Sequence, residues 1–193
     1  DDGSLDSAAA HVDTEGLADQ LGERQRPKGG PRRDLEVGAL LAVAHGPAVA
    51  NTTDNEWERL FRVNVTGTFY ACRAAVPHMP DGASIVNMAS INSFVAWEND
   101  APYTATKGAV LQFTRALALE LAPRQIRVNA VCPGVIDTPM SSDMIENQPD
   151  AMKEIMRDQP IGRPGRPDEV AAAALWLCSP AASLVIGVAL PVD

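Results

Sequence analysis

Short apolar runs alternate with longer stretches of helical pattern along most of the chain. Between the apolar runs, apolar residues recur every three or four positions, which is the spacing of one helix face. Residues 1–34 are harder to read, with a short helix expected at 15–24 and loop composition at 25–34. The runs themselves have the character of buried strands, and they lie at 35–44, 84–88 and 126–131.

Residues 51–78 carry a helical pattern that one polar residue interrupts. Thr53 or Asp54 can cap its start, and Glu56 falls in the first turn. Asn64 lies within the apolar stripe, and a buried asparagine needs hydrogen-bond partners, which can be structural or functional. From the residues alone, Asn64 is interpreted as structural. The apolar residues of the stripe are Trp57, Leu60, Phe61, Val65 and Phe69.

The longest predicted helix covers residues 101–122. Asp100 is the candidate cap, and Pro102 is tolerated in the first turn. This helix is also nonpolar outside its main stripe, which indicates a second packing partner. The stripe expected to be buried consists of Ala105, Ala109, Phe113, Ala116, Leu117 and Leu121.

Two further helical regions are predicted near the carboxyl end of the chain. Residues 139–160 carry Met140, Met144 and Met152 among many charges, as in a pair of short amphipathic helices. A helix is also predicted from Pro167, where the carboxylates of Asp168 and Glu169 complement the helix dipole.

Composition and charge narrow the class of protein. A chain of 193 residues, 46% apolar and 21% charged, can bury the core of one soluble domain. Its net charge of -9 disfavours nucleic acid and anionic membranes as partners. No run approaches the ~18 to 20 apolar residues of a membrane span, and the acidic start lacks the pattern of a secretory signal. Three widely spaced cysteines argue against a disulfide framework and a zinc site, so a cytoplasmic setting without metal is expected.

The candidate chemistry centres on Ser90, Tyr103 and Lys107. Tyr103 and Lys107 are four residues apart, so their side chains can meet on one helix face. A nearby ammonium favours the phenolate of a tyrosine and brings its pKa toward the working range. Ser90 follows a predicted strand, and open parallel sheets place ligands at the carboxyl ends of their strands. The alternative for the Tyr103 and Lys107 pair is a solvated surface pair.

Two more motifs accompany these three residues, one before them in the sequence and one after. They are Asn64-Val-Thr-Gly-Thr-Phe and Asn129-Ala-Val-Cys-Pro-Gly-Val-Ile-Asp-Thr-Pro. Taken jointly, the motifs resemble the short-chain dehydrogenase/reductase family from about Glu56 to Asp193. The resemblance implies an α/β fold, a Rossmann-like doubly wound parallel sheet with helices on both faces, as a single domain over residues 1–193. It also implies that this domain is incomplete at its N-terminus, because the family's glycine-rich cofactor turn has no counterpart here.

The resemblance assigns a role to each candidate residue. Tyr103 is expected to be the general acid/base, Lys107 the charge that lowers its pKa and binds the nicotinamide ribose, and Ser90 the donor to the substrate oxygen. Asn64 is expected to kink its helix and to hold a water that links Lys107 to solvent. The residues expected to bind the cofactor, besides Tyr103 and Lys107, are Pro133, Gly134, Ile136 and Thr138. From the residues alone, Pro133 and Gly134 also fit a plain turn.

The function expected from the resemblance is hydride transfer between a nicotinamide cofactor and a secondary alcohol or ketone. The sequence does not choose between NAD and NADP. A homodimer or homotetramer is expected, because family members pair their long helices across a subunit interface. One alternative is a catalytically silent member that acts as an oligomeric scaffold. A sugar-nucleotide epimerase or dehydratase is another, although the segment at Pro133 and the short chain weigh against it.

Overall fold

The computed structural model describes residues 48–138, 141, 152–153, 156–157 and 159–193. The strand expected at 35–44, the helix expected at 15–24 and most of the paired helices expected at 139–160 lie outside these residues. Their predictions therefore stay predictions.

The described strands form a parallel sheet in the order β1-β2-β3. Strand β1 (Ser84–Met88) pairs with β2 (Arg127–Pro133), and β2 pairs with β3 (Ala189–Val192). The strand predicted at 84–88 is confirmed. The strand predicted at 126–131 extends further, because its ladder with β3 continues through Cys132 and Pro133.

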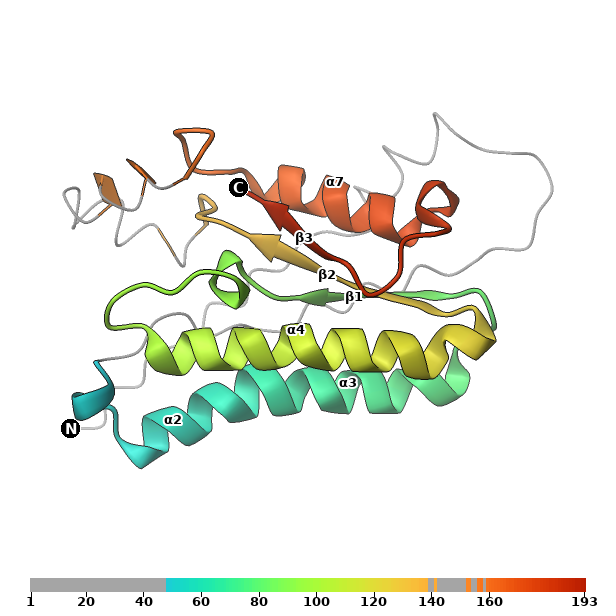
Figure 1. Ribbon diagram of the computed structural model, residues 1–193, viewed down its shortest axis with the longest axis horizontal. Coiled ribbons are helices and arrows are strands. Elements are labelled where there is room, and N and C mark those ends of the chain that lie inside the picture. The colour runs from blue at the N-terminus through green and yellow to red at the C-terminus, as the bar shows by residue number, and fades with distance from the viewer. Residues whose placement is uncertain (1–47, 139–140, 142–151, 154–155, 158) are drawn as a thin grey trace. The chain divides into compact units, whose positions relative to one another are not determined.

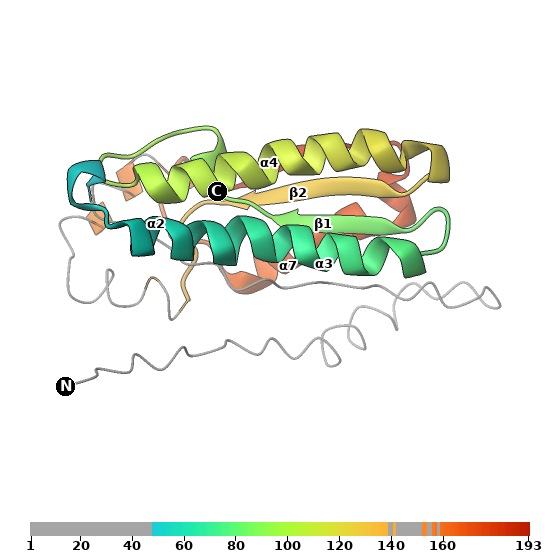
Figure 2. The ribbon, with the colours of Figure 1, turned by 90° about the horizontal axis from the view of Figure 1, so that it is seen from below.

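Helices cover both faces of this sheet (Figures 1 and 2). Helices α3 (Gly67–Ala75) and α4 (Ala101–Leu121) pack against one face, where Cys72 and Leu117 meet Val128 of β2. Helix α7 (Pro167–Cys178) covers the other face, where Val170 and Leu177 meet Val131 of β2. The arrangement confirms the doubly wound α/β fold, and α7 begins at the predicted proline.

Strand β2, in the middle of the sheet, contributes side chains to the core on both faces of the sheet. Val128, Ala130 and Cys132 point toward the α3 and α4 face, whereas Val131 points toward α7. This alternation is the period of two that a strand imposes on its side chains. Each of these four side chains is 0% exposed, so β2 is buried on both faces, as its apolar run predicts.

The helix predicted over residues 51–78 is irregular in its middle. Helix α2 (Asp54–Phe61) begins with the predicted cap, because the Thr53 hydroxyl accepts from the Glu56 N–H and the Glu56 carboxylate accepts from the Thr53 N–H. A π-helical turn, Arg62–Thr66, then separates α2 from α3. Asn64 lies in this turn and is 3% exposed, and π-turns inside helices are a known cause of kinks.

Helix α4 buries a different face from the one predicted. Leu117 and Leu121 are buried as expected, but Ala105 and Ala116 are exposed. The buried positions instead include two threonines, and each hydroxyl donates to a backbone carbonyl one turn back in the helix, Thr106 to Tyr103 and Thr114 to Val110. The expected stripe was partly wrong, because the buried face runs through Thr106, Val110 and Thr114 instead of Ala105 and Ala116.

Asn129 of β2 ties the sheet to the segment before β3, and its loss should destabilise the fold. Its side chain is 0% exposed, and its amide donates to the Val185 carbonyl at 2.9 Å and accepts from the Val188 N–H at 3.0 Å. Asn129→Ala is expected to lower the free energy of unfolding by about 1 to 3 kcal/mol, because the backbone groups of two half-buried residues, the Val185 carbonyl and the Val188 N–H, lose these partners. Urea denaturation measures the effect, and Asn55→Ala on the exposed surface of α2 is the matched control.

Candidate active site

The sequence-predicted residues meet where the strands of the sheet end. The arrowheads of β1, β2 and β3 point toward the end of the sheet at which α4 begins (Figure 1). Ser90 follows β1, Gly134 follows β2, and Tyr103 lies in the first turn of α4. Three separate parts of the chain therefore meet at the carboxyl ends of the strands, where open parallel sheets bind ligands.

Ser90 and Tyr103 are in contact. The Ser90 hydroxyl is hydrogen-bonded to the Tyr103 phenol, and Ser90 is 7% exposed while Tyr103 is half-buried. The fold thus brings together two residues that are thirteen positions apart in the sequence. The alternative of a solvated surface pair does not fit Lys107, which is 2% exposed, whereas Tyr103 is half-buried.

Burial and polar neighbours both act on the pKa of Tyr103. Burial raises the pKa of the phenol above its ordinary value, the hydrogen bond from Ser90 lowers it, and the charge of Asp100 raises it further. Desolvation of the phenolate outweighs the favourable contact with Ser90, and the predicted lowering of this pKa by the ammonium of Lys107 stays a prediction. Tyr103 is held as the neutral phenol, which is the form that donates a proton.

Lys107 lies beside the phenol and is almost fully buried. Its Nζ donates to the Met88 carbonyl at 3.3 Å and lies 5.5 Å from the centroid of the Tyr103 ring, and the residue is 2% exposed. Burial lowers the pKa of Lys107 to about 8, against a smaller opposing effect of the Cys132 thiol. The side chain is thus a cation at neutral pH that titrates slightly above it.

Asn64 packs against the turn of α4 that carries Tyr103 and Lys107. Its Nδ2 donates to the Thr106 hydroxyl at 3.0 Å, and that hydroxyl donates to the Tyr103 carbonyl at 2.7 Å. The π-turn and the start of α4 are joined in this way. The water that the resemblance assigns to Asn64 stays a prediction.

Two residues that the sequence reasoning missed support the Ser90 side chain. The Asn92 N–H donates to the Ser90 hydroxyl, the hydroxyl donates to Asn92 Oδ1, both at 3.2 Å, and Asn92 Nδ2 donates to Asp100 Oδ2 at 2.7 Å. Asn92 and Asp100 are 3% and 2% exposed. Asp100 does precede α4 as predicted, but its carboxylate holds Asn92 and makes no capping bond to the helix. In the sequence, the one sign of this network is that polar residues lie close to the predicted catalytic serine.

The residues predicted to face the cofactor form an ordered segment after β2. The Gly134 N–H donates to the Val192 carbonyl at 3.0 Å, and Ile136 forms a parallel bridge with Gly165. The Thr138 N–H donates to the Ser141 hydroxyl at 3.1 Å. A Cβ on Gly134 would lie 2.7 Å from Asp193 Cβ and 2.9 Å from Gln159 Oε1, so only glycine fits there. Pro133 closes β2, and the plain-turn alternative for Pro133 and Gly134 is still open.

A cavity of about 330 Å³ opens between this segment and the loop after Ser90. Its wall on the loop side is apolar and includes Trp97. The residues that line it are Ile91, Val95, Ala96, Trp97, Gly134, Gln159 and Asp193.

The residues present fit a nicotinamide nucleotide at Lys107. A lysine ammonium has three N–H donors. Within the described part of the chain, the hydrogen bond to Met88 uses one of them, which leaves two N–H donors for a ligand. The described residues contain no group of three or more His, Cys, Asp or Glu side chains that could hold a metal ion.

Because the pKa of Lys107 is lowered in the folded state, the free energy of unfolding depends on pH. Because this pKa is about 8 in the folded state and 10.5 ordinarily, the unfolded chain binds more protons between these values, so stability rises with pH there. Relative to Lys107→Met, the wild-type chain is expected to gain about 2 kcal/mol in free energy of unfolding between pH 7.5 and 9.5. Urea denaturation of both proteins across this range tests it, and an unchanged difference would refute the burial of a titrating lysine.

Among the described helices, none is both long and apolar enough to cross a membrane.

Comparisons with known proteins show what the chain is similar to. A family model described as Enoyl-(Acyl carrier protein) reductase matches residues 37–193. The chain is 41% identical over 155 residues to 3beta-hydroxysteroid dehydrogenase 1 of Eggerthella lenta, covering 77% of this chain and 59% of that protein. The chain therefore spans less than two thirds of the length of this relative.

Two solved structures resemble the fold and carry nicotinamide cofactors. One is a 3-ketoacyl-(acyl-carrier-protein) reductase from Brucella melitensis complexed with NADH, with 37% identity, a TM-score of 0.71 and coverage of 79% of this chain and 63% of that one. The other is an angucycline C-6 ketoreductase with bound NADP, with 26% identity, a TM-score of 0.73 and coverage of 78% and 58%.

Proposed function

Because the chain belongs to the short-chain dehydrogenase/reductase family, we propose that it transfers hydride between NAD or NADP and a secondary alcohol or ketone. The observation that carries this proposal is the convergence of three groups. A serine hydroxyl, a phenol and a buried ammonium lie together at the carboxyl edge of a parallel sheet. Relatives that act on hydroxysteroids and ketones support the same chemistry.

Tyr103 is the proposed general acid for ketone reduction. Its phenol, kept neutral by burial, donates its proton to the carbonyl oxygen of the substrate as that oxygen gains negative charge. Ser90 hydrogen-bonds the same oxygen and aligns it with the phenol; its single O–H turns from Asn92 Oδ1 toward the substrate, while the Asn92 N–H still donates to the Ser90 oxygen. In alcohol oxidation the phenolate takes the proton back.

Lys107 stabilises the negative charge that forms on Tyr103 and holds the cofactor. Its ammonium lies over the phenol ring, in a buried site where a charge acts more strongly than in water. The bound nicotinamide supplies or accepts the hydride. Pro133, Gly134, Ile136 and Thr138 form the proposed contact with its carboxamide, and Asn64 supplies the proposed link from Lys107 to solvent.

The apolar wall of the cavity favours a substrate with an apolar surface. Ile91, Val95 and Trp97 contribute this wall on the side of the loop that follows Ser90. Burying apolar substrate area against them is favourable, whereas no charged side chain of this loop wall would pair with an ionic substrate.

Helices α3 and α4 support the proposal of a homodimer or homotetramer. Tyr70 of α3 is 54% exposed and Leu119 of α4 is 79% exposed, so both helices present apolar area to a partner. Cys72, Cys132 and Cys178 are free thiols, which suits the proposed cytoplasmic setting.

Titration of the purified 193-residue chain with NADH and NADPH tests the proposed function. Saturable fluorescence changes at micromolar to millimolar cofactor concentrations are expected. The cofactor that binds with the lower dissociation constant is the preferred one. Absence of binding at millimolar concentrations of both would contradict the enzyme and favour the silent scaffold.

A further inference from the structure

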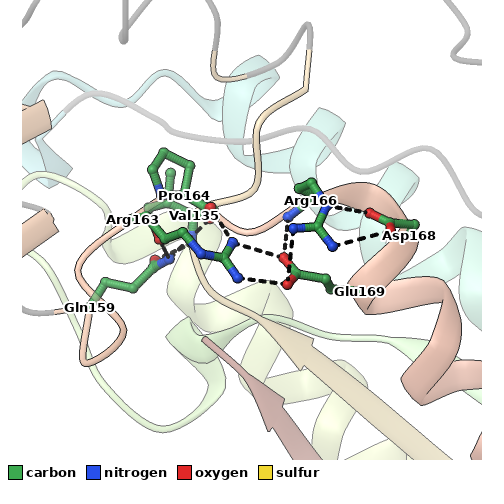
Figure 3. Close-up of polar contacts among 7 residues, drawn as sticks. All are labelled: Val135, Gln159, Arg163, Pro164, Arg166, Asp168 and Glu169. Carbon is green, nitrogen blue, oxygen red and sulfur yellow. Dashed lines mark hydrogen bonds and ion pairs between the residues drawn. The ribbon is translucent and has the colours of Figure 1, made fainter.

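Gln159 lies outside the predicted catalytic set but touches the proposed cofactor segment directly. It is 6% exposed and lines the cavity described above, and its side chain points toward Val135 (Figure 3). A buried amide must have its donors and acceptor satisfied, and the partners of this one decide what it does.

Both ends of the Gln159 amide bind one residue of that segment. Its Oε1 accepts from the Val135 N–H at 2.8 Å, and its Nε2 donates to the Val135 carbonyl at 3.3 Å. The same Nε2 donates to the Arg163 carbonyl at 2.6 Å. The two N–H donors of Nε2 distinguish glutamine from glutamate, which keeps the acceptor oxygen but lacks these donors.

A second set of contacts anchors Gln159 to the start of α7. Arg163 forms a two-pronged ion pair with Glu169, at 3.0 and 2.7 Å (Figure 3). The Arg166 N–H donates to the same carboxylate at 2.8 Å. These contacts hold the pKa of Glu169 at about 2, Arg163 contributing most, so the anchor keeps its charge from acidic to alkaline pH.

The clamped segment has no room for a side chain at Gly134. Gly134 approaches Gln159 so closely that a Cβ would lie 2.9 Å from Oε1. The Gly165 N–H donates to the Val135 carbonyl at 2.8 Å, so this carbonyl is held from two directions. The backbone of residues 134–136 is therefore fixed by a side chain that comes from far along the chain.

We propose that Gln159 is a positioning residue for the nicotinamide cofactor, which it serves by clamping the Val135 peptide and so fixing the segment from Pro133 to Thr138. This inference rests on the proposed function, since it assigns the cofactor to that segment. Gln159 acts through the backbone and does not take part in proton transfer.

Three variants test the clamp. Gln159→Ala removes every contact, Gln159→Glu keeps the size but replaces the donor with an acceptor, and Gln112→Ala removes an exposed glutamine of α4 as the control. The first readout is the hydrogen-exchange rate of the Val135 amide, measured by nuclear magnetic resonance. Gln159→Ala is expected to exchange roughly tenfold faster than wild type at this amide, and Gln112→Ala at the wild-type rate. Gln159→Glu is also expected to exchange faster, because repulsion between its carboxylate and the two carbonyls displaces the oxygen that accepts from the Val135 N–H.

Gln159→Glu adds a pH test that a general loss of stability would not reproduce. At neutral pH its carboxylate faces the carbonyls of Val135 and Arg163, which both repel it. Protonation returns one O–H donor, so the ratio of its Val135 exchange rate to that of wild type is expected to fall as the pH is lowered toward 4. The same ratio for Gln159→Ala is expected to stay constant.

The second readout is the dissociation constant of NADH and NADPH, with kcat and KM for the cofactor. The Gln159 variants are expected to bind the preferred cofactor roughly three- to tenfold more weakly and to raise its KM more than they lower kcat. Unchanged Val135 exchange would overturn the clamp. Faster exchange with unchanged cofactor affinity would overturn the positioning role. If the wild-type chain binds neither cofactor, the proposed function fails and the positioning role fails with it.

Discussion

Tyr103→Phe is expected to lower kcat about 10²- to 10⁴-fold, the contribution that a positioned general acid usually makes. Phenylalanine fills the same space but has no proton to donate to the substrate oxygen. Since phenylalanine keeps the ring and its contact with Lys107, the thermal melting curve is expected to stay close to wild type. Steady-state turnover with a panel of secondary alcohols and ketones measures the effect.

The control for this substitution is Tyr70→Phe. Tyr70 lies on α3, is 54% exposed, and stacks its ring under the Arg73 guanidinium, a contact that phenylalanine keeps. Turnover of this variant is expected to match wild type. Near-normal turnover of Tyr103→Phe in the same assay would end the proposed mechanism.

Lys107→Met is expected to reduce both turnover and cofactor affinity. Loss of the buried cation next to a developing phenolate is expected to lower kcat about 10²- to 10³-fold. Loss of the charged donors to the ribose is expected to weaken NADH or NADPH binding roughly 10- to 100-fold. Arg115→Met, which removes an exposed cation further along α4, is the matched control.

The pKa of Lys107 predicts how cofactor affinity depends on pH. Because that pKa is about 8, the ammonium is present below this pH and is lost above it. Cofactor affinity of the wild-type chain is therefore expected to fall as the pH rises through 8, whereas the affinity of Lys107→Met is expected to change little. A parallel fall in both proteins would show that another group is responsible.

The sequence predicted the elements of the fold most accurately where local chemistry sets them. The apolar run at 84–88 is β1, Thr53 with Glu56 caps α2, and Pro167 begins α7. A run of apolar residues, a capping box and a proline act within a few residues, so the sequence contains all that decides them.

The buried face of α4 could not be predicted in the same way. Thr106 and Thr114 lie in the core because distant amides meet them, Asn64 at 3.0 Å and Asn87 at 2.9 Å. These partners come from the π-turn and from β1, which are 42 and 27 residues away along the chain. A polar residue in a hydrophobic pattern can therefore be a core residue whenever the fold supplies its hydrogen bonds.

The sequence by itself determined which residues carry the candidate chemistry: the spacing of Tyr103 and Lys107 and the motif order give the family. Only the tertiary structure decided the state of those residues. Burial raises the pKa of Tyr103 and lowers that of Lys107, and Gln159 clamps Val135 from 24 residues away. Desolvation and long-range hydrogen bonds depend on which groups surround an atom in space, and a linear pattern does not record those neighbours.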